Sequence, residues 1–198
     1  MTSPITRREA LARLAAITGA VAIGAEAFVA GCSRAPSAVP RTFSAGDVAL
    51  LDEIGDTIIP ATDTPGAKSI GIGALMATLA TDCYEDDAFA SFRRGLDAVE
   101  SACRAKYGTS FVQTPAAQRT ALLNEIDAEQ REHGRTRERD EPPHYFRLMK
   151  ELTLLGYFSS EVGCTQALRY VESPGAYHGD VPYAKGDRIW FNPTRRVS

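Results

Sequence analysis

Side chains that could carry out catalysis are present in the chain, but not in the patterns that catalysis needs. The three histidines, His133, His144 and His178, are scattered, and a metal site built from them would need distant convergence. The pair Gly71 and Gly73 is followed by Met76 where a dinucleotide-binding fingerprint requires glycine. No haem-attachment motif, metalloprotease motif, phosphate-binding loop or nucleophile elbow occurs. We therefore predict no catalytic residue, no cofactor site and no metal site in this chain.

One cluster of carboxylates contains the residue types that acid–base catalysis uses. It comprises Asp82, Glu85, Asp86 and Asp87. Acids at the start of a helix favour the helix dipole and supply caps. Because a helix is predicted to begin here, we interpret the cluster as structural.

Four cysteines matter because the chain is expected to enter an oxidising compartment. Cys83 and Cys103 continue apolar stripes, so they are either buried thiols or one bridge between two helices. Cys164 then remains as a plausible thiol for pairing with another chain, although it also lies on an apolar face. The fourth, Cys32, belongs to the N-terminal segment.

The N-terminal segment, residues 1–31, is laid out as an export signal. Arg7 and Arg8 precede an apolar run, Ala15–Val29, which ends in small residues before Cys32. The paired arginines resemble the twin-arginine (Tat) consensus. The prediction is export through the Tat translocase to the periplasm.

This segment has two alternative interpretations. A membrane-spanning helix needs about 20 apolar residues, and this run is shorter and contains Glu26. Cleavage near Ala30 by signal peptidase I competes with lipoprotein processing, in which Cys32 would be lipidated and anchor the protein. The residues leave this choice open.

The remaining chain has the length and charge of one soluble domain. Removal of residues 1–31 leaves 167 residues with a net charge of −4, from −3 for the full chain. Nucleic-acid binding would demand a basic stripe, so we expect no nucleic-acid partner. The tract 131–141 alternates in sign and is interpreted as a solvated loop.

Periodicity predicts an all-α fold, a small irregular bundle of five to six helices over residues 43–171. A flexible linker, 32–42, precedes it. Ser44 and Asp47 predict a helix start, and Thr114 is expected to cap another. The expected helices span about 44–58, 73–83, 87–107, 114–130, 144–156 and 160–170.

Apolar spacing within those helices predicts which side chains form the core. The expected inward residues are Val48, Leu51, Ile54, Ile58, Leu75, Met76, Leu79, Cys83, Phe89, Phe92, Leu96, Val99, Cys103, Leu122, Leu123, Ile126, Tyr145, Met149, Leu152, Leu155, Cys164 and Leu168.

The last segment, residues 172–198, is irregular yet rich in aromatic side chains. Tyr177, Tyr183, Trp190 and Phe191 stand among prolines. Disordered segments avoid aromatic residues, whereas interface cores favour Tyr, Trp and Arg. We expect an extended arm that packs on another surface, and the alternative is an arm folded back over its own bundle.

Two long segments carry a resemblance to a known family. Asp56–Ala67 looks like the first signature of the gluconate 2-dehydrogenase subunit 3 family, and Phe146–Gly163 looks like the second. Ala167–Tyr170 and Pro174–Gly179 fit its closing segment. The resemblance covers about residues 43–182, behind a matching Tat signal.

The resemblance implies a non-catalytic small subunit of a periplasmic sugar, polyol or sugar-acid dehydrogenase. The large partner of such subunits is a flavoprotein of the glucose-methanol-choline (GMC) class, which holds the FAD, and a multihaem cytochrome c often accepts the electrons. The small subunit assists maturation of the flavoprotein and carries it through the Tat translocase. An exported binding or structural lipoprotein is the alternative, and a stand-alone enzyme would need a ligand set that the chain lacks.

No catalytic residue of the family exists to transfer to this chain. The candidates are instead partner contacts, although turn chemistry alone also explains the Pro and Gly of the first signature. The predicted interface residues are Thr64, Pro65, Tyr157, Phe158, Cys164, Tyr177, Tyr183 and Trp190.

Overall fold

The protein is described by a computed structural model in which helices dominate. It describes residues 41–138, 141–171, 175, 180 and 182–191. The predicted export signal with Arg7, Arg8 and Cys32, and the arm residue Tyr177, lie outside this part of the chain. The elements are α2 (Ala45–Ile58), η1 (Ala67–Ile70), α3 (Ile72–Cys83), α4 (Asp86–Tyr107), η2 (Phe111–Gln113), α5 (Ala116–Thr136), α6 (Tyr145–Ser159), η3 (Gly163–Ala167), β1 (Arg169–Tyr170) and β2 (Trp190–Phe191).

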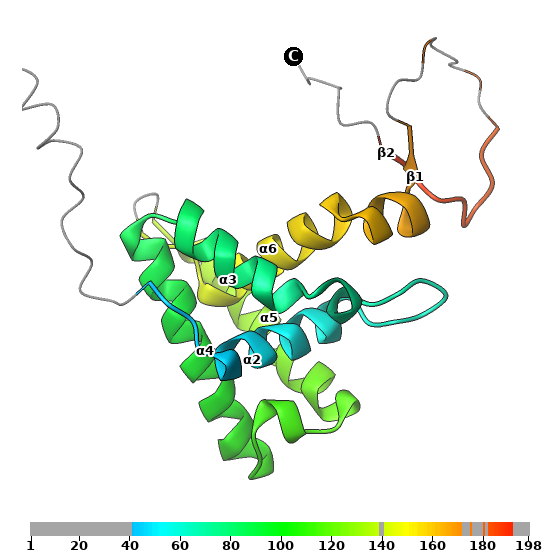
Figure 1. Cartoon of the computed structure of the whole chain (residues 1–198). Coiled ribbons are helices and arrows are strands. Elements are labelled where there is room, and N and C mark those ends of the chain that lie inside the picture. Colours follow the sequence, from blue (N-terminus) through cyan, green and yellow to red (C-terminus); the bar gives the residue numbers. More distant parts are fainter. Residues whose placement is uncertain (1–40, 139–140, 172–174, 176–179, 181, 192–198) are drawn as a thin grey trace, which may run out of the picture. The chain divides into compact units, whose positions relative to one another are not determined.

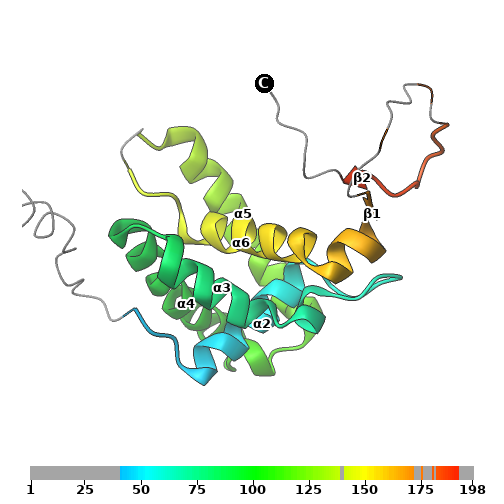
Figure 2. The ribbon, with the colours of Figure 1, turned by 45° about the horizontal axis from the view of Figure 1, so that its top comes forward.

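The helices pack around one core, and the predicted all-α class is confirmed. Helices α2 and α3 lie side by side, and α6 crosses α3 and α4 (Figures 1 and 2). The two strands have two residues each and pair in parallel, with Arg169 opposite Trp190. The largest fully buried side chains are Tyr157, Phe89, Phe92, Phe111, Phe146, Leu51, Ile54, Ile72, Met76, Leu96, Met149 and Val99.

Helix α2 begins and ends where the sequence predicts. Ser44 and Asp47 form a reciprocal capping box, in which each side chain bonds the other residue's backbone N–H. The helix ends at Ile58, two residues before Pro60.

Helix α3 packs on α2 at very short range because glycines line the contact. A Cβ atom added to Gly73 would lie 2.3 Å from the carbonyl oxygen of Val48. The backbone N–H of Gly73 donates to Asp52 Oδ1 at 2.7 Å. This close approach explains why the buried face of α3 differs from the prediction: small residues face α2, whereas Cys83 is exposed.

Helix α4 confirms the clearest apolar stripe that the sequence predicts. Every predicted inward residue of this helix is buried. Gly108 follows the helix with φ +74°, a left-handed conformation that glycine adopts at low cost.

Helix α5 begins one residue later than predicted, and its predicted cap is wrong. Thr114 is not its cap, because the Thr114 hydroxyl is buried and bonds Ser110 O, Thr109 and Cys103 instead. Pro115 takes the capping position without a side-chain bond.

The tract 131–141 is also not wholly a loop, since α5 continues to Thr136. Pairs of charges one turn apart, Arg131 with Asp127 and Arg135 with Glu132, stabilise this extension.

The end of α6 departs from the prediction as well. The helix continues to Ser159, and Leu155, predicted to face inward, is 58% exposed. The helix expected over 160–170 is a shorter turn, and Arg169–Tyr170 form β1.

Candidate functional site

The two segments that resemble family signatures meet in the folded chain. The Tyr157 hydroxyl, at the end of α6, donates to the carbonyl oxygen of Pro65 at 2.6 Å. Tyr157 is 1% exposed. It therefore cannot supply surface itself; it fixes the loop that precedes η1. Two predicted interface residues, ninety-two positions apart in sequence, thus lie together.

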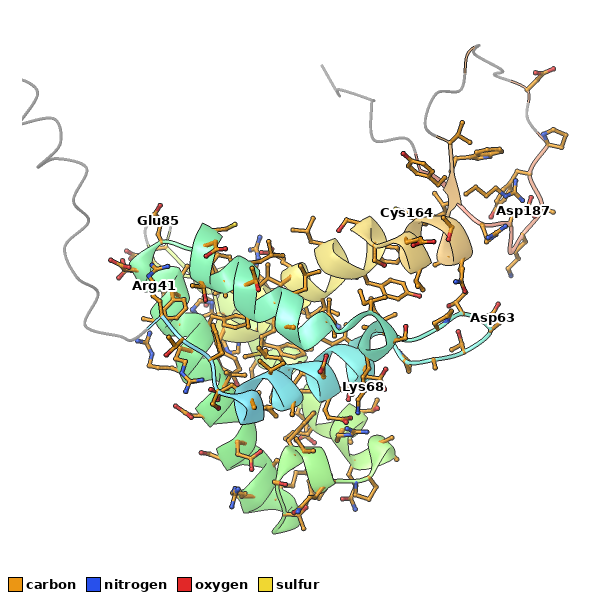
Figure 3. The ribbon with its side chains drawn as sticks, in the orientation of Figure 1. Arg41, Asp63, Lys68, Glu85, Cys164 and Asp187 are labelled. Atoms are coloured by element: carbon orange, nitrogen blue, oxygen red, sulfur yellow. The ribbon has the colours of Figure 1, made fainter. Side chains whose placement is uncertain are left out.

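The loop of residues 60–66 is irregular but tightly held at its base. The N–H of Ala67 donates to Ile59 O, and Thr62 N–H donates to Thr64 O, both at 2.9 Å. A Cβ atom on Gly66 would lie 2.6 Å from Asp56 Oδ1, so only glycine fits. The exposed tip, marked by Asp63 in Figure 3, projects from the bundle.

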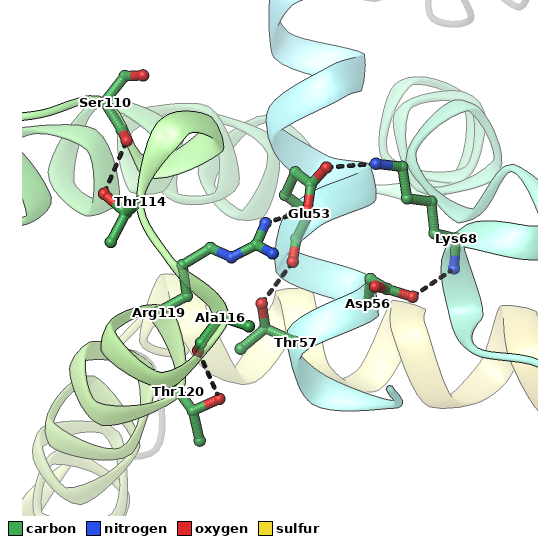
Figure 4. Close-up of polar contacts among 9 residues, drawn as sticks. All are labelled: Glu53, Asp56, Thr57, Lys68, Ser110, Thr114, Ala116, Arg119 and Thr120. Atoms are coloured by element: carbon green, nitrogen blue, oxygen red, sulfur yellow. Dashed lines mark hydrogen bonds and ion pairs between the residues drawn. The ribbon is translucent and has the colours of Figure 1, made fainter. Parts of the chain in front are cut away.

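Beneath this loop, one glutamate joins three elements. Glu53 of α2 bonds Lys68 of η1 and Arg119 of α5 (Figure 4). Burial alone would raise the pKa of Glu53, but the hydrogen bonds from the two cations outweigh it and lower the pKa. Glu53 is therefore ionised at neutral pH, and its pairs with Lys68 and Arg119 connect η1, which follows the loop, to α2 and α5.

The second signature ends in a sharp corner after α6. Ser160 Oγ donates to Tyr157 O at 2.6 Å and accepts from Gly163 N–H at 3.1 Å. A Cβ atom on Gly163 would lie 1.9 Å from Tyr157 O, so this position also requires glycine. Cys164 is half-buried, and its thiol donates to Phe158 O at 3.1 Å.

The other predicted contact residues divide by exposure. Thr64, Pro65 and Phe158 are half-buried. Tyr183 and Trp190 are largely exposed, at 78% and 55%. Sequence reasoning did not single out Ile189, which is 73% exposed beside Trp190, and it placed Leu155 in the core. No periodic signal marked Ile189, because it lies in a segment without helical period.

The cysteines are free thiols in three different settings. Cys83 is exposed, and Cys103 is buried, where its sulfur shares a hydrogen bond with Thr114 Oγ1 at 3.1 Å. The structure thus shows Cys103 as a core thiol rather than as half of a bridge with Cys83. Cys164 remains a half-buried thiol beside the corner.

Titratable groups elsewhere are engaged in structural pairs. Asp127 lines a cavity of about 180 Å³ between α2, α5 and α6, and it binds Lys150 Nζ at 2.6 Å and Arg131. His144 caps α6 by accepting from Phe146 N–H, and burial together with His133 lowers its pKa. Within the described ranges, no group of three His, Cys, Asp or Glu residues could hold a metal ion.

The comparisons with known proteins assign the family. The family model for gluconate 2-dehydrogenase subunit 3 matches residues 45–175. The chain belongs to this family. Neither the curated proteins nor the solved structures gave a match.

Membership makes the chain an accessory subunit of a dehydrogenase complex. The matched stretch of this subunit 3 protein includes both signature segments and the Tyr157–Pro65 contact. The exposed residues Tyr183, Ile189 and Trp190 lie beyond it. In the part of the chain that the structure describes, no helix is both long and apolar enough to cross a membrane.

Proposed function

We propose that this chain is the non-catalytic small subunit of a periplasmic FAD-dependent sugar, polyol or sugar-acid dehydrogenase. It assists maturation of the flavoprotein large subunit, a GMC-class oxidoreductase, and carries that subunit through the Tat translocase. The FAD belongs to the large subunit, and a multihaem cytochrome c accepts the electrons. The match over residues 45–175 is the observation that carries this proposal.

The folded site supports a binding role. The loop of residues 60–66 is fixed by the hydrogen bond from buried Tyr157 and by the ion pair of Glu53 with Lys68, yet its tip is exposed. A preorganised loop loses little conformational entropy on association, which favours binding. Charged side chains here are used to hold the loop, and we assign them no catalytic role.

The N-terminal residues support export. Arg7 and Arg8 precede an apolar run, and Cys32 follows it. Lipidation of Cys32 would anchor the subunit to the membrane. An exported binding or structural lipoprotein is the alternative function, and it would act without a flavoprotein.

Affinity purification of the tagged full chain from its native periplasm tests the proposal. We expect a larger co-purifying chain with a flavin absorption spectrum and dye-linked oxidation of a sugar or polyol. A colourless protein that folds alone and retains no flavoprotein would support the lipoprotein alternative.

Export is tested by the double substitution Arg7→Lys and Arg8→Lys. Because the Tat pathway reads paired arginines, both this subunit and the flavoprotein are expected to leave the periplasmic fraction. Arg13→Lys is the matched control, since it changes an arginine of the same segment outside the pair. Equal flavoprotein export in all three strains would contradict carriage by this subunit.

A further inference from the structure

Exposed apolar side chains gather at one end of the described molecule. Among the described residues, seven large hydrophobic side chains are exposed, and six of them fall between Leu154 and Trp190. The exception, Val112, belongs to η2. The six are Leu154, Leu155, Tyr170, Tyr183, Ile189 and Trp190. An apolar gathering of this kind is typical of an interaction site.

The arm that carries most of these residues is fixed to the end of the helical body. Arg188 donates to the carbonyl oxygens of Thr165 and Gln166, both at 3.0 Å, and so caps η3. Arg169 pairs with Asp187 at 3.5 Å and stacks over the Trp190 ring at 5.3 Å. Residues 187–190 of the arm are therefore fixed to the end of the helical body.

A shallow groove runs along this surface. It has a volume of about 360 Å³ and is lined by Arg169, Tyr183, Ile189 and Trp190, among others. Aromatic and arginine side chains around an apolar centre are the composition that dominates binding energy at protein interfaces.

The charge of the arm differs from that of the helical body. Residues 41–167 carry 13 basic and 20 acidic residues, whereas residues 168–198 carry five basic and three acidic ones. A symmetric pair of copies would place two basic arms together, which is unfavourable. A different protein with an apolar patch flanked by carboxylates fits this surface better.

The chain enters the bundle at the opposite end. Arg41 donates to Thr81 O, to Tyr84 O and to Asp86 Oδ1, and its guanidinium lies 4.8 Å from the Phe89 ring centroid. The first residue that the structure describes is therefore held at the junction of α3 and α4.

Helix α6 separates these two ends. The Tyr84 hydroxyl, beside the Arg41 site, lies 3.4 Å from Leu148 O in the first turns of α6, whereas the arm is fixed to η3 beyond the helix. With 15 residues, α6 spans about 22 Å. Figure 3 shows Arg41 at one end and Cys164 and Asp187 at the other.

We propose that the surface formed by Arg169, Tyr183, Ile189 and Trp190 docks the flavoprotein large subunit, through an apolar, carboxylate-flanked patch on that partner. This inference rests on the proposed function. The docking surface lies at the end of the described body away from Arg41, the described residue nearest in sequence to the predicted export signal.

The test compares two apolar-to-acidic substitutions in the full chain, co-expressed with the flavoprotein that co-purifies with it. Ile189→Glu places a carboxylate on the docking surface, and Val112→Glu is the matched control in η2. Compared with the wild type, we expect Ile189→Glu to retain at most about one tenth of the flavoprotein. Val112→Glu is expected to retain as much as the wild type. Circular dichroism melts of both variants check that the helical fold is kept.

A second readout does not depend on weakening the complex. A photoreactive benzoylphenylalanine replaces Trp190 or Val112, and only the Trp190 position is expected to crosslink to the flavoprotein. Equal retention by both variants, or crosslinking from Val112 alone, would overturn the docking surface. A crosslinked product of two small subunits, or adsorption to anionic vesicles that Ile189→Glu abolishes, would assign the surface to a second copy or to lipid and would also overturn it.

These outcomes separate the two proposals. If the wild-type chain retains no flavoprotein, the proposed function fails. If the wild type and Ile189→Glu retain it equally, only the docking surface fails. The Arg7→Lys and Arg8→Lys variant is expected to bind flavoprotein normally inside the cytoplasm, because neither residue belongs to the proposed docking surface; loss of that binding would contradict docking by this surface alone.

Discussion

At the scale of single residues, Tyr157 joins the two signature segments through one hydrogen bond. The substitution Tyr157→Phe keeps the buried ring and leaves the Pro65 carbonyl without this partner. We expect it to lower the free energy of unfolding by about 1 kcal/mol. Tyr183→Phe, at a 78% exposed ring, is the control. Urea denaturation measures both, and an equal midpoint shift would show that the Tyr157 bond contributes nothing.

The ionisation of Glu53 makes the stability of the fold depend on pH. Its lowered folded-state pKa means that ionised Glu53 stabilises the fold above the unfolded value near 4.5, and this contribution is lost as pH falls through the folded pKa. We expect Glu53→Gln to cost roughly 1–3 kcal/mol at pH 7, because Arg119 loses its buried partner.

The same substitution should matter less in acid. Below the folded-state pKa of Glu53 the wild type is itself protonated, so the two unfolding curves converge as pH falls from 7 to 3. Urea midpoints across that range measure the difference. A gap that stays constant with pH would show that the charge of Glu53 is not the cause.

At the scale of elements, glycine sets the distance between α2 and α3. Gly73→Ala would improve helix propensity, but the added Cβ meets Val48 O at 2.3 Å. The steric cost of overpacking therefore exceeds the gain in helix propensity, and we expect the free energy of unfolding to fall by about 1–3 kcal/mol. Gly134→Ala in α5, where the nearest atom is 3.8 Å away, should instead gain about 0.5–1 kcal/mol. Thermal melts distinguish the two, and a stabilised Gly73→Ala would refute the close contact.

The elements also show how far sequence reasoning reaches. Caps and long apolar stripes predicted α2 and α4, because those signals are local. The buried face of α3 was missed, since small residues there are chosen by the approach of another helix. Leu155 was misplaced because the buried face of α6 runs through Leu152, Gly156 and Tyr157, which leaves Leu155 on the outer side of the helix.

The candidate site was predictable in part. The signature segments marked the loop and the corner, but no pattern could show that Tyr157 is buried and holds Pro65. Ile189 escaped notice because an irregular segment has no period from which exposure can be read. Arg41 was assigned to the linker, although its side chain binds the α3–α4 junction.

At the scale of the whole molecule, an acidic body bears a basic arm. If the arm docks the flavoprotein, the rim charge Lys185, which is exposed, should speed the encounter by attracting carboxylates on the partner. We expect Lys185→Glu to slow association by roughly threefold at low salt, with less change in dissociation, and the difference should shrink as salt screens the charges.

The position of the substituted residue, rather than the net charge of the protein, is expected to decide the change in association rate. Arg135→Glu makes the same change of charge on α5, where the side chain is exposed and pairs only with Glu132 among the described residues. Surface plasmon resonance with immobilised flavoprotein measures both variants. A slower encounter for Lys185→Glu alone supports docking by the arm, because long-range attraction from the whole molecule would slow both variants equally. Equal slowing of both variants would show that the net charge of the protein steers association and that the arm has no specific part in the encounter.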